Sequence, residues 1–251
     1  TSAPFSSGQN NVAMGYQALT AFTTGHSNVA VGQGAGDSIT TGYQNTILGQ
    51  NAATNITTGY SNVSIGPASL NFNVKGYGAV AIGQNAGYGF GRGGGHTPVG
   101  SVFVGNTSGY YASGSYNVFV GYESGKGGTS GTPYSSGEHN IGMGYRSLYG
   151  FTTGDDNVAI GAYSGDAITT GTYNIAMGQY SLSSVNTGGS NIGIGRLAGA
   201  NNTSANGNIY IGYGSGYSNQ TGIGNTIIGN SSYGQSVVAG LNITGVTTVG
   251  N

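Results

Sequence analysis

Apolar and polar positions alternate in a short unit that recurs along the chain. Each unit holds two apolar residues that flank a third position and precede a glycine, as Val29 and Val31 precede Gly32. Alternation over so short a stretch predicts a β-strand with one buried face, because side chains along a strand point to opposite sides in turn. We therefore expect the paired aliphatic residues to form the core and the residue between them to face outward.

The glycine that ends the unit recurs with a period of seventeen. The copies with this period are Gly15, Gly32, Gly49, Gly66 and Gly83, then Gly144, Gly161, Gly178, Gly195, Gly212 and Gly229. Gly105 and Gly121 lie between these two runs, at spacings of twenty-two, sixteen and twenty-three, so the chain holds thirteen copies. A short fixed period is the signature of a solenoid, and a unit of this length is too short for two helices. The sequence thus predicts an all-β fold, a β-solenoid or parallel β-roll of about thirteen coils.

We expect a single repeat domain over residues 1–251. Its coils are regular at about 10–87 and 140–239, and two loop insertions enlarge the coils within 88–139. Each coil is expected to hold a second, more polar strand. That strand would end at another glycine, often after two threonines, in a turn that needs a positive φ.

Asparagine stands four residues before the glycine in eleven of the thirteen copies, with Ala79 and Ser101 as the exceptions. Such a column predicts a ladder in which each side-chain amide bonds its neighbour one coil away. The predicted ladder residues are Asn11, Asn28, Asn45, Asn62, Asn117, Asn140, Asn157, Asn174, Asn191, Asn208 and Asn225. Three residues after the glycine the chain uses only alanine or serine, which indicates a turn where backbones crowd.

Charged residues make up 4% of the 251 residues, and the formal net charge is −1. This balance gives no electrostatic footprint for nucleic acid, and no apolar run is long enough to cross a bilayer. We therefore expect no nucleic acid and no membrane among the partners. The absence of cysteine excludes disulfides and thiolate metal sites.

Catalysis requires ionisable side chains that converge, and six acidic residues and three histidines are the whole supply. Asp37 and Asp166 occupy the same repeat column but belong to distant coils. His26, His96 and His139 have no metal-ligand spacing. We expect no catalytic residue, no cofactor and no metal site, so the chain is not expected to be an enzyme.

Two insertions, at residues 87–101 and 124–139, enlarge the same side of the predicted coils. Loops on one face of a solenoid often form its binding face. Tyrosine stacks on sugar rings and basic residues bind acidic groups, which makes this region a candidate site for a glycan or another polar ligand. The candidate ligand-binding residues are Arg92, His96, Tyr110, Tyr111, Lys126 and Tyr134. The alternative is that these glycine-rich loops persist because solenoids tolerate insertions.

A thin roll buries few side chains per coil, so its stability alone is marginal. The middle residues of the apolar triplets carry no charge and include Ala30, Ile47, Phe103, Phe119 and Tyr210. An uncharged column of this kind, if it faces outward, suits a partner subunit. We expect self-association, either as a side-by-side oligomer or as an end-to-end filament.

The repeat resembles units of known fibrous proteins. "NNVAMGYQALTAFTTG" at residues 10–25 is similar to bacteriophage tail-fibre arrays, and "NVAIG" with a later "TTG" resembles the head repeats of YadA-like trimeric autotransporter adhesins. The resemblance covers the chain from Asn10 to about Gly229. It implies a left-handed roll, a homotrimer with the "NVAIG" strand turned inward, and binding to a receptor on a host surface.

Three functions are consistent with these features. The first is a structural rod of a phage tail fibre or surface adhesin that mediates attachment, located outside the cell on a virion or cell surface. The second is a subunit of an extracellular self-assembling filament. The third is an ice-binding solenoid, suggested by threonine pairs at Thr23, Thr40, Thr57, Thr152 and Thr169 but interrupted at Lys75, Ser113 and Asn186.

Overall fold

The computed structural model describes residues 6–91, 98–128, 135–230 and 247–249. The chain forms two compact units: unit 1 comprises Thr1–Val120 with Ser130–Tyr134, and unit 2 comprises Gly121–Thr129 with Ser135–Asn251. Each unit is a parallel β-solenoid with a period of about seventeen, and together they carry one strand for each of the thirteen repeat copies and a fourteenth strand after the last copy. The predicted fold class is therefore confirmed.

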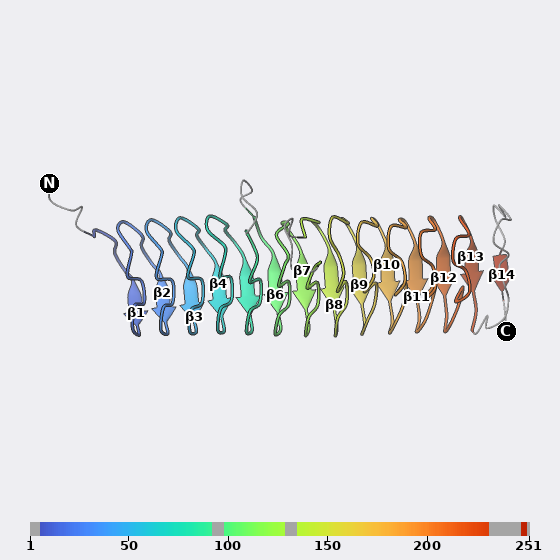
Figure 1. Ribbon diagram of the computed structural model, residues 1–251, viewed down its shortest axis with the longest axis horizontal. Helices are drawn as coiled ribbons and strands as arrows, with labels where there is room; N and C mark the ends of the chain where they lie inside the picture. The colour runs from blue at the N-terminus through green and yellow to red at the C-terminus, as the bar shows by residue number, and fades with distance from the viewer. Residues whose placement is uncertain (1–5, 92–97, 129–134, 231–246, 250–251) are drawn as a thin grey trace. The chain divides into compact units, whose positions relative to one another are not determined.

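Every turn contributes one strand of three residues, and successive strands of a unit pair in parallel in sequence order (Figure 1). The strands of unit 1 are β1 (Val12–Met14), β2 (Val29–Val31), β3 (Thr46–Leu48), β4 (Val63–Ile65), β5 (Val80–Ile82), β6 (Val102–Val104) and β7 (Val118–Val120). Those of unit 2 are β8 (Ile141–Met143), β9 (Val158–Ile160), β10 (Ile175–Met177), β11 (Ile192–Ile194), β12 (Ile209–Ile211), β13 (Thr226–Ile228) and β14 (Thr247–Val249).

The register of the strands is unaffected by the irregular spacings in unit 1. Val80 pairs with Val102 across a longer connection, and Val102 pairs with Val118 across a shorter one. These are the same strand positions that pair at the regular period, as Val12 does with Val29. Changes of length are therefore absorbed in the connections between strands, and equivalent residues stay aligned.

The prediction of a second strand in each coil is wrong for the described residues. The threonine segments form turns and bends, although they still bond to the next coil, as when the Thr40 N–H donates to the Thr57 carbonyl at 3.0 Å. The positive φ of this region lies at Gln44 and its equivalents rather than at the second glycine. That glycine is needed for close approach, because a Cβ on Gly25 would lie 2.6 Å from the Gly42 carbonyl oxygen.

The two faces of strands β2 to β13 are the reverse of the prediction. From β2 to β13 the middle residue of every strand is buried, whereas the flanking aliphatic residues are half-buried or exposed. In β9, Ala159 is 0% exposed and Ile160 is 39% exposed. The interior of a coil is narrow, since other inward side chains come from the turns, and it admits one side chain from each strand. Because the middle residue of a strand points into this interior, the two residues beside it point outward.

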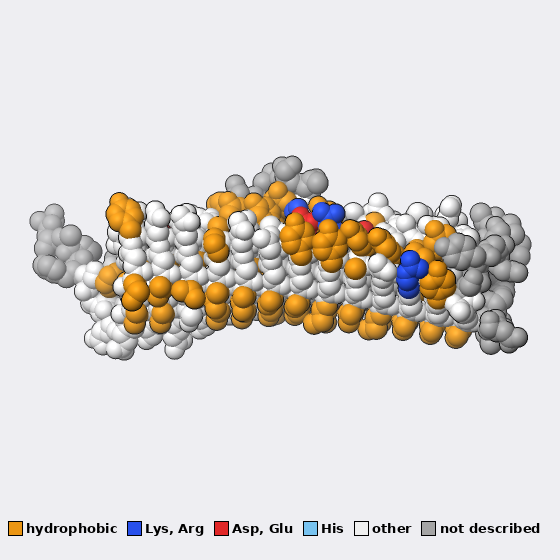
Figure 2. All heavy atoms as spheres, turned by 90° about the horizontal axis from the view of Figure 1, so that it is seen from below, with side chains coloured by type: hydrophobic (Ala, Val, Ile, Leu, Met, Phe, Trp, Pro, Cys, Tyr) orange, Lys and Arg blue, Asp and Glu red, His pale blue; other side chains and the backbone are white. Residues whose placement is uncertain are grey.

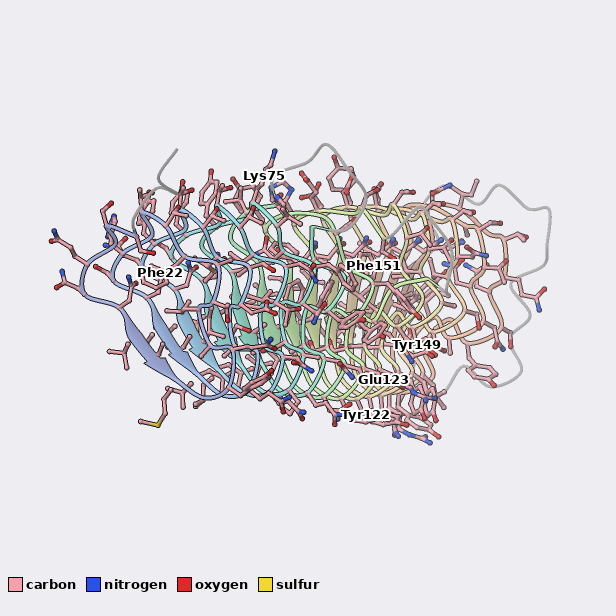
Figure 3. The ribbon with its side chains drawn as sticks, turned by 60° about the vertical axis from the view of Figure 1, so that its left-hand side comes forward. Phe22, Lys75, Tyr122, Glu123, Tyr149 and Phe151 are labelled. Carbon is pink, nitrogen blue, oxygen red and sulfur yellow. The ribbon has the colours of Figure 1, made fainter. Side chains whose placement is uncertain are left out.

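The core of each unit lies inside the coils and is filled by inward columns of complementary size. One column is the middle of the strands, and a second stands four residues after the repeat glycine. Where the first column holds Phe103, the second holds Gly109, and where the second holds Leu182, the first holds Ala176. A third buried column includes Phe151, which points inward in Figure 3, whereas Lys75 is exposed.

Tyr210 shows how this packing treats a buried polar group. Its side chain is fully buried, and its hydroxyl accepts hydrogen bonds from the side chains of Asn202 at 3.5 Å and Asn219 at 2.5 Å. These asparagines occupy the column that holds Ile168 and Val185 in neighbouring coils. Burial raises the pKa of the Tyr210 phenol. Asparagine replaces the aliphatic residue of this column in the two coils beside the Tyr210 hydroxyl, and it thus gives the buried hydroxyl hydrogen-bond partners.

From Ala35 to Ser215 the column of alanine and serine is buried, and its serines form hydrogen bonds. Ser164 donates to the Ala176 carbonyl at 2.7 Å and Ser181 donates to the Gly193 carbonyl at 2.8 Å. Each acceptor is the middle residue of the next strand along the chain. A small side chain is required because this position is enclosed, and serine adds a hydrogen bond between coils.

Asparagine side chains bond along the stack in both units. The Asn174 amide donates to Asn157 Oδ1 at 3.0 Å and to the Gly188 carbonyl at 2.9 Å, and Asn174 Oδ1 accepts from the backbone and side chain of Asn191. The same pattern links Asn11, Asn28, Asn45 and Asn62 in unit 1 and Asn140, Asn157, Asn174, Asn191, Asn208 and Asn225 in unit 2. Asn117 differs, because its amide donates to Gly114 within its own coil.

Alanine at Gly216 is expected to destabilise unit 2 more than alanine at Gly224. Both glycines have left-handed φ, +64° and +69°, but a Cβ at Gly216 would overlap the Tyr210 ring, whereas a Cβ at Gly224 would meet nothing within 4 Å. The backbone penalty of about 1–2 kcal/mol is common to both variants, and overpacking adds about 1–3 kcal/mol at Gly216 alone. Denaturant unfolding of Gly216→Ala and Gly224→Ala measures the difference; equal losses would contradict the packing described here.

Replacement of Asn174 by alanine is expected to lower the free energy of unfolding by about 2–4 kcal/mol, because it leaves buried donors on Asn191 without their acceptor. The matched control is Asn206→Ala. Asn206 is exposed, and its side chain accepts one hydrogen bond, from the Gly189 N–H at 2.6 Å. We expect the control to lose less than about 1 kcal/mol in the same denaturant titration. A smaller loss for Asn174→Ala than for the control would show that the amide column is dispensable.

Candidate functional site

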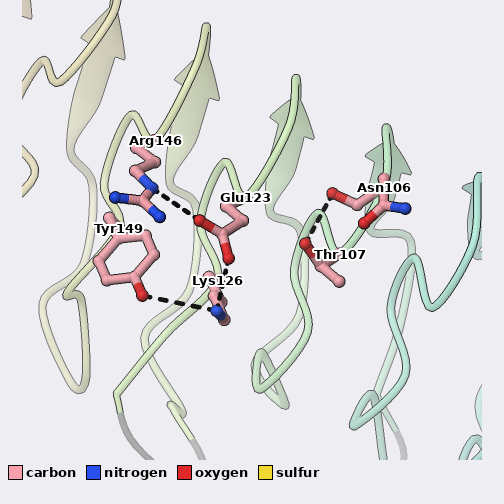
Figure 4. A network of polar contacts seen from close by, with 6 residues as sticks. All are labelled: Asn106, Thr107, Glu123, Lys126, Arg146 and Tyr149. Carbon is pink, nitrogen blue, oxygen red and sulfur yellow. Dashed lines mark hydrogen bonds and ion pairs between the residues drawn. The ribbon is translucent and has the colours of Figure 1, made fainter.

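Unit 2 holds a cluster of charged side chains centred on Glu123 (Figure 4). Glu123 Oε1 lies 2.6 Å from Lys126 Nζ, and Glu123 Oε2 lies 2.6 Å from Arg146 Nε. The Glu123 side chain is 8% exposed, so both ion pairs are shielded from water on one side. We call Glu123, Lys126, Arg146 and Tyr149 the charged cluster.

The stacking of coils brings these four residues together. Glu123 and Arg146 both stand two residues after the repeat glycine, and Lys126 and Tyr149 both stand five residues after it. The Arg146 N–H donates to the Tyr122 carbonyl at 3.0 Å, which sets the two coils in register at this point. Equivalent positions of adjacent coils therefore face one another, although they are far apart in the sequence.

Aromatic rings support the two cations of the cluster. Lys126 Nζ lies 5.3 Å from the centroid of the Tyr149 ring, and Arg146 Cζ lies 5.1 Å from the same centroid. Arg146 also lies 5.3 Å from the Tyr145 ring, which stacks on Tyr122 at 5.5 Å. Tyr122 and Tyr145 are exposed, and Figure 3 shows Tyr122 and Glu123 near one another on this part of the unit. The cluster therefore borders an aromatic surface.

The charges of the cluster stabilise one another. Burial alone would raise the pKa of Glu123, but the hydrogen bonds and charges of Lys126 and Arg146 outweigh it and hold that pKa below its usual value. Burial works against the charge of Lys126, yet its bond to Glu123 leaves the Lys126 pKa above its usual value. All three groups are thus ionised at neutral pH. The arrangement favours a fixed ionic network over a group that exchanges protons.

Asp166 follows Tyr149 in the same repeat column of unit 2. Its Oδ1 atom is buried and accepts no hydrogen bond from the residues that the structure describes. Burial raises the pKa of this carboxyl from 3.8 to about 6, although its own backbone N–H and the charge of Arg146 act in the opposite direction. Asp166 is therefore the group of this region whose charge changes near neutral pH.

The six predicted ligand-binding residues are divided between the two units and the segments outside the described residues. Arg92, His96 and Tyr134 lie outside the described residues. Tyr110 and Tyr111 belong to unit 1, where Tyr110 stacks on Tyr88 at 4.8 Å and meets Tyr111 edge-on at 4.6 Å. Lys126 belongs to unit 2 and binds Glu123.

Sequence reasoning missed Glu123, Arg146 and Tyr149 as partners of Lys126. The signal was present in the repeat columns, because a glutamate and an arginine stand at the same position of consecutive coils. Opposite charges at equivalent positions of adjacent coils predict an ion pair, just as opposed residues of paired strands do. A repeat column therefore predicts ion pairs between coils in the same way as it predicts ladders of side-chain amides.

No group of three or more His, Cys, Asp or Glu side chains among the described residues could hold a metal ion. Nor is any helix of those residues long and apolar enough to cross a membrane.

The fold defines the chain as a parallel β-solenoid repeat protein. Comparisons with protein-family models, curated proteins and solved structures found no match. The resemblance to tail-fibre and adhesin repeats therefore rests on the repeat columns themselves.

The stability of unit 2 is expected to fall as the pH rises from about 4 to about 6. The raised pKa means that folded Asp166 binds more protons than unfolded Asp166 in this window, so the unfolded state gains on ionisation, and the loss persists above pH 6. Asp166→Asn is expected to flatten this part of the profile when urea midpoints are measured from pH 4 to 8. Asp37→Asn is the control, because Asp37 Oδ1 accepts a hydrogen bond from Ser38. A profile of Asp166→Asn parallel to the wild type would contradict the assignment.

Proposed function

We propose that the chain is a structural, non-catalytic segment of an extracellular fibre or adhesin, and that it self-associates through the outward aliphatic side chains of its strands. The observation that carries this proposal is the row of exposed apolar residues along the strands of both units (Figure 2). We call this row the aliphatic stripe. Its most exposed members are Val12, Met14, Val29, Leu48 and Ile82 in unit 1 and Met143, Ile160, Met177, Ile194 and Ile228 in unit 2.

The aliphatic stripe has the composition of a surface that excludes water on assembly. No strand from β1 to β13 contains a charged residue. Scattered exposed apolar residues are normal on a soluble protein, but a column of valine, isoleucine, leucine and methionine repeated at every coil is a contiguous apolar surface. Its burial against a second copy of the chain would remove this surface from water at every coil, and no charge in the strands would oppose it.

Side-by-side assembly is favoured over an end-to-end filament by the position of the stripe. The exposed aliphatic residues lie on the strand face of the coils, where only a partner alongside would cover them. The resemblance to trimeric adhesin heads, which implies that the "NVAIG" strand turns inward, agrees with this geometry. We therefore propose a homotrimer whose strands face a common axis, leaving the turn surfaces free for a receptor or glycan.

An ice-binding role receives less support. The first threonine of each pair donates its hydroxyl to the next coil, as Thr40 does to the Thr57 carbonyl at 3.2 Å and Thr152 does to the Thr169 carbonyl at 3.0 Å. These hydroxyls already donate hydrogen bonds to carbonyl groups of the next coil. The threonine column that suggested the ice-binding role therefore stabilises the contact between coils.

A double substitution on the stripe tests the proposal. Met143→Lys combined with Met177→Lys places two charges on exposed positions of β8 and β10, so we expect a folded chain that sediments as a monomer. Thr170→Lys combined with Thr187→Lys adds the same charge at exposed turn positions and is expected to keep the wild-type mass. Sedimentation velocity of the three proteins decides the matter. A monomeric wild type, or loss of assembly in both double variants, would contradict the proposal.

A further inference from the structure

Unit 1 carries three tyrosines stacked in consecutive coils, Tyr43, Tyr60 and Tyr77, which we call the tyrosine stack. The ring centroids of Tyr43 and Tyr60 lie 4.8 Å apart and those of Tyr60 and Tyr77 lie 4.7 Å apart, with 4° between the planes in both pairs. His26 extends the row at 5.0 Å from Tyr43. The stack therefore holds three phenols in parallel at the spacing of the coils.

The register of the strands produces this alignment. The three tyrosines stand eleven residues after the repeat glycine, and the paired strands β2 to β5 keep each coil in phase with the next. Each tyrosine is half-buried. Because neighbouring rings cover one another's faces, the stack offers ring edges and hydroxyls to a reagent rather than open faces to a sugar.

We propose that the tyrosine stack is a site of oxidative crosslinking, in which a peroxidase with hydrogen peroxide, or another one-electron oxidant, joins neighbouring rings as dityrosine. Each of two phenols loses one electron and its hydroxyl proton to give a tyrosyl radical. The radicals form a carbon–carbon bond between the ring positions next to the hydroxyls, and the hydrogen on each bonded carbon returns to an oxygen, which restores both phenols. Two electrons and two protons leave, and they reduce one hydrogen peroxide to two molecules of water.

Geometry distinguishes this stack from the more exposed tyrosines of the chain. Tyr16 is 70% exposed and Tyr173 is 63% exposed, so accessibility alone would make these two residues react first. A radical formed in the stack has a second phenol within ring-stacking distance, whereas a radical on Tyr16 or Tyr173 must meet its partner by diffusion. Pre-positioned groups react as though their partner were at very high concentration.

A crosslink in the stack would join successive coils covalently. The bond between Tyr43 and Tyr60 closes a loop of one repeat, and the bond between Tyr60 and Tyr77 closes the next. Such closures restrict the unfolded chain, as other covalent crosslinks do, and they oppose the separation of coils. The inference rests on the positions of the rings and does not depend on the proposed function.

The test treats dilute wild-type protein with a peroxidase and hydrogen peroxide, digests it with thermolysin and identifies linked peptides by mass spectrometry. Peptides that join Tyr43 to Tyr60 or Tyr60 to Tyr77, each lighter by two hydrogen atoms, should exceed links to Tyr16 or Tyr173 by about tenfold or more. The same treatment in urea should abolish this preference. Links distributed according to exposure in the folded protein would overturn the proposal.

A pair of variants isolates the role of the central phenol. Tyr60→Phe keeps an aromatic ring in the stack but removes the hydroxyl, and Tyr43 and Tyr77 are then two coils apart, roughly 10 Å. Dityrosine from the stack should fall by about tenfold in this variant and should be unchanged in Tyr173→Phe. Undiminished yield in Tyr60→Phe would refute the assignment. Should that variant fail to fold, the comparison of folded and urea-treated wild type still decides the question.

Discussion

Parallel hydrogen bonding between coils in constant register is the constraint on which the structure of each unit depends. Val29 pairs with Thr46, and Thr46 pairs with Val63. With these pairs fixed, the remaining residues of each of these coils lie beside their equivalents in the next coil. Glycine is required where carbonyl groups approach it, as at Gly15, where a Cβ would lie 2.6 Å from the Gly32 carbonyl oxygen. Amide columns, tyrosine stacks and the ion pairs of Glu123 all follow from the same alignment. A side chain is thus selected chiefly by what stands one coil away.

Much of this arrangement can be predicted from the sequence, because residues that stack in space recur at a fixed spacing along the chain. The period of seventeen and the positions of β1 to β13 were predictable from glycine and aliphatic residues alone, whereas β14 lies beyond the predicted copies. The face of each strand was not, because alternation shows only that Ala159 and Ile160 point to opposite sides. Their direction depends on the width of the interior, which the turns determine. The second strand was predicted wrongly because threonine and glycine suit a bend as well as a strand end.

Because the strand faces are inverted, the surface of the strands is formed by other residues than those predicted. The sequence predicts that Phe103, Phe119 and Tyr210 face a partner, yet all three are buried, and glycines make room for the rings of Phe103 and Tyr210. The residues left outside on β2 to β13 are uncharged and mostly aliphatic, and they form the aliphatic stripe through which we propose assembly. The charged cluster and the tyrosine stack lie instead on turns, where insertions and substitutions leave strand pairing intact. Each unit therefore carries its apolar side chains on the strand surface and its charged and stacked aromatic groups on the turn surfaces.

The most direct measurement of this account compares two lysine substitutions at adjacent positions of β9. Ile160→Lys should still fold and show a cooperative urea transition, because in the separated chain the new charge lies in water, even though it opposes the proposed assembly. Ala159→Lys should lose most of its folded signal, because the lysine would enter a closed interior with no anionic partner. The opposite result, a tolerated lysine at residue 159 and an unfolded chain with lysine at residue 160, would contradict the inward direction of the middle column.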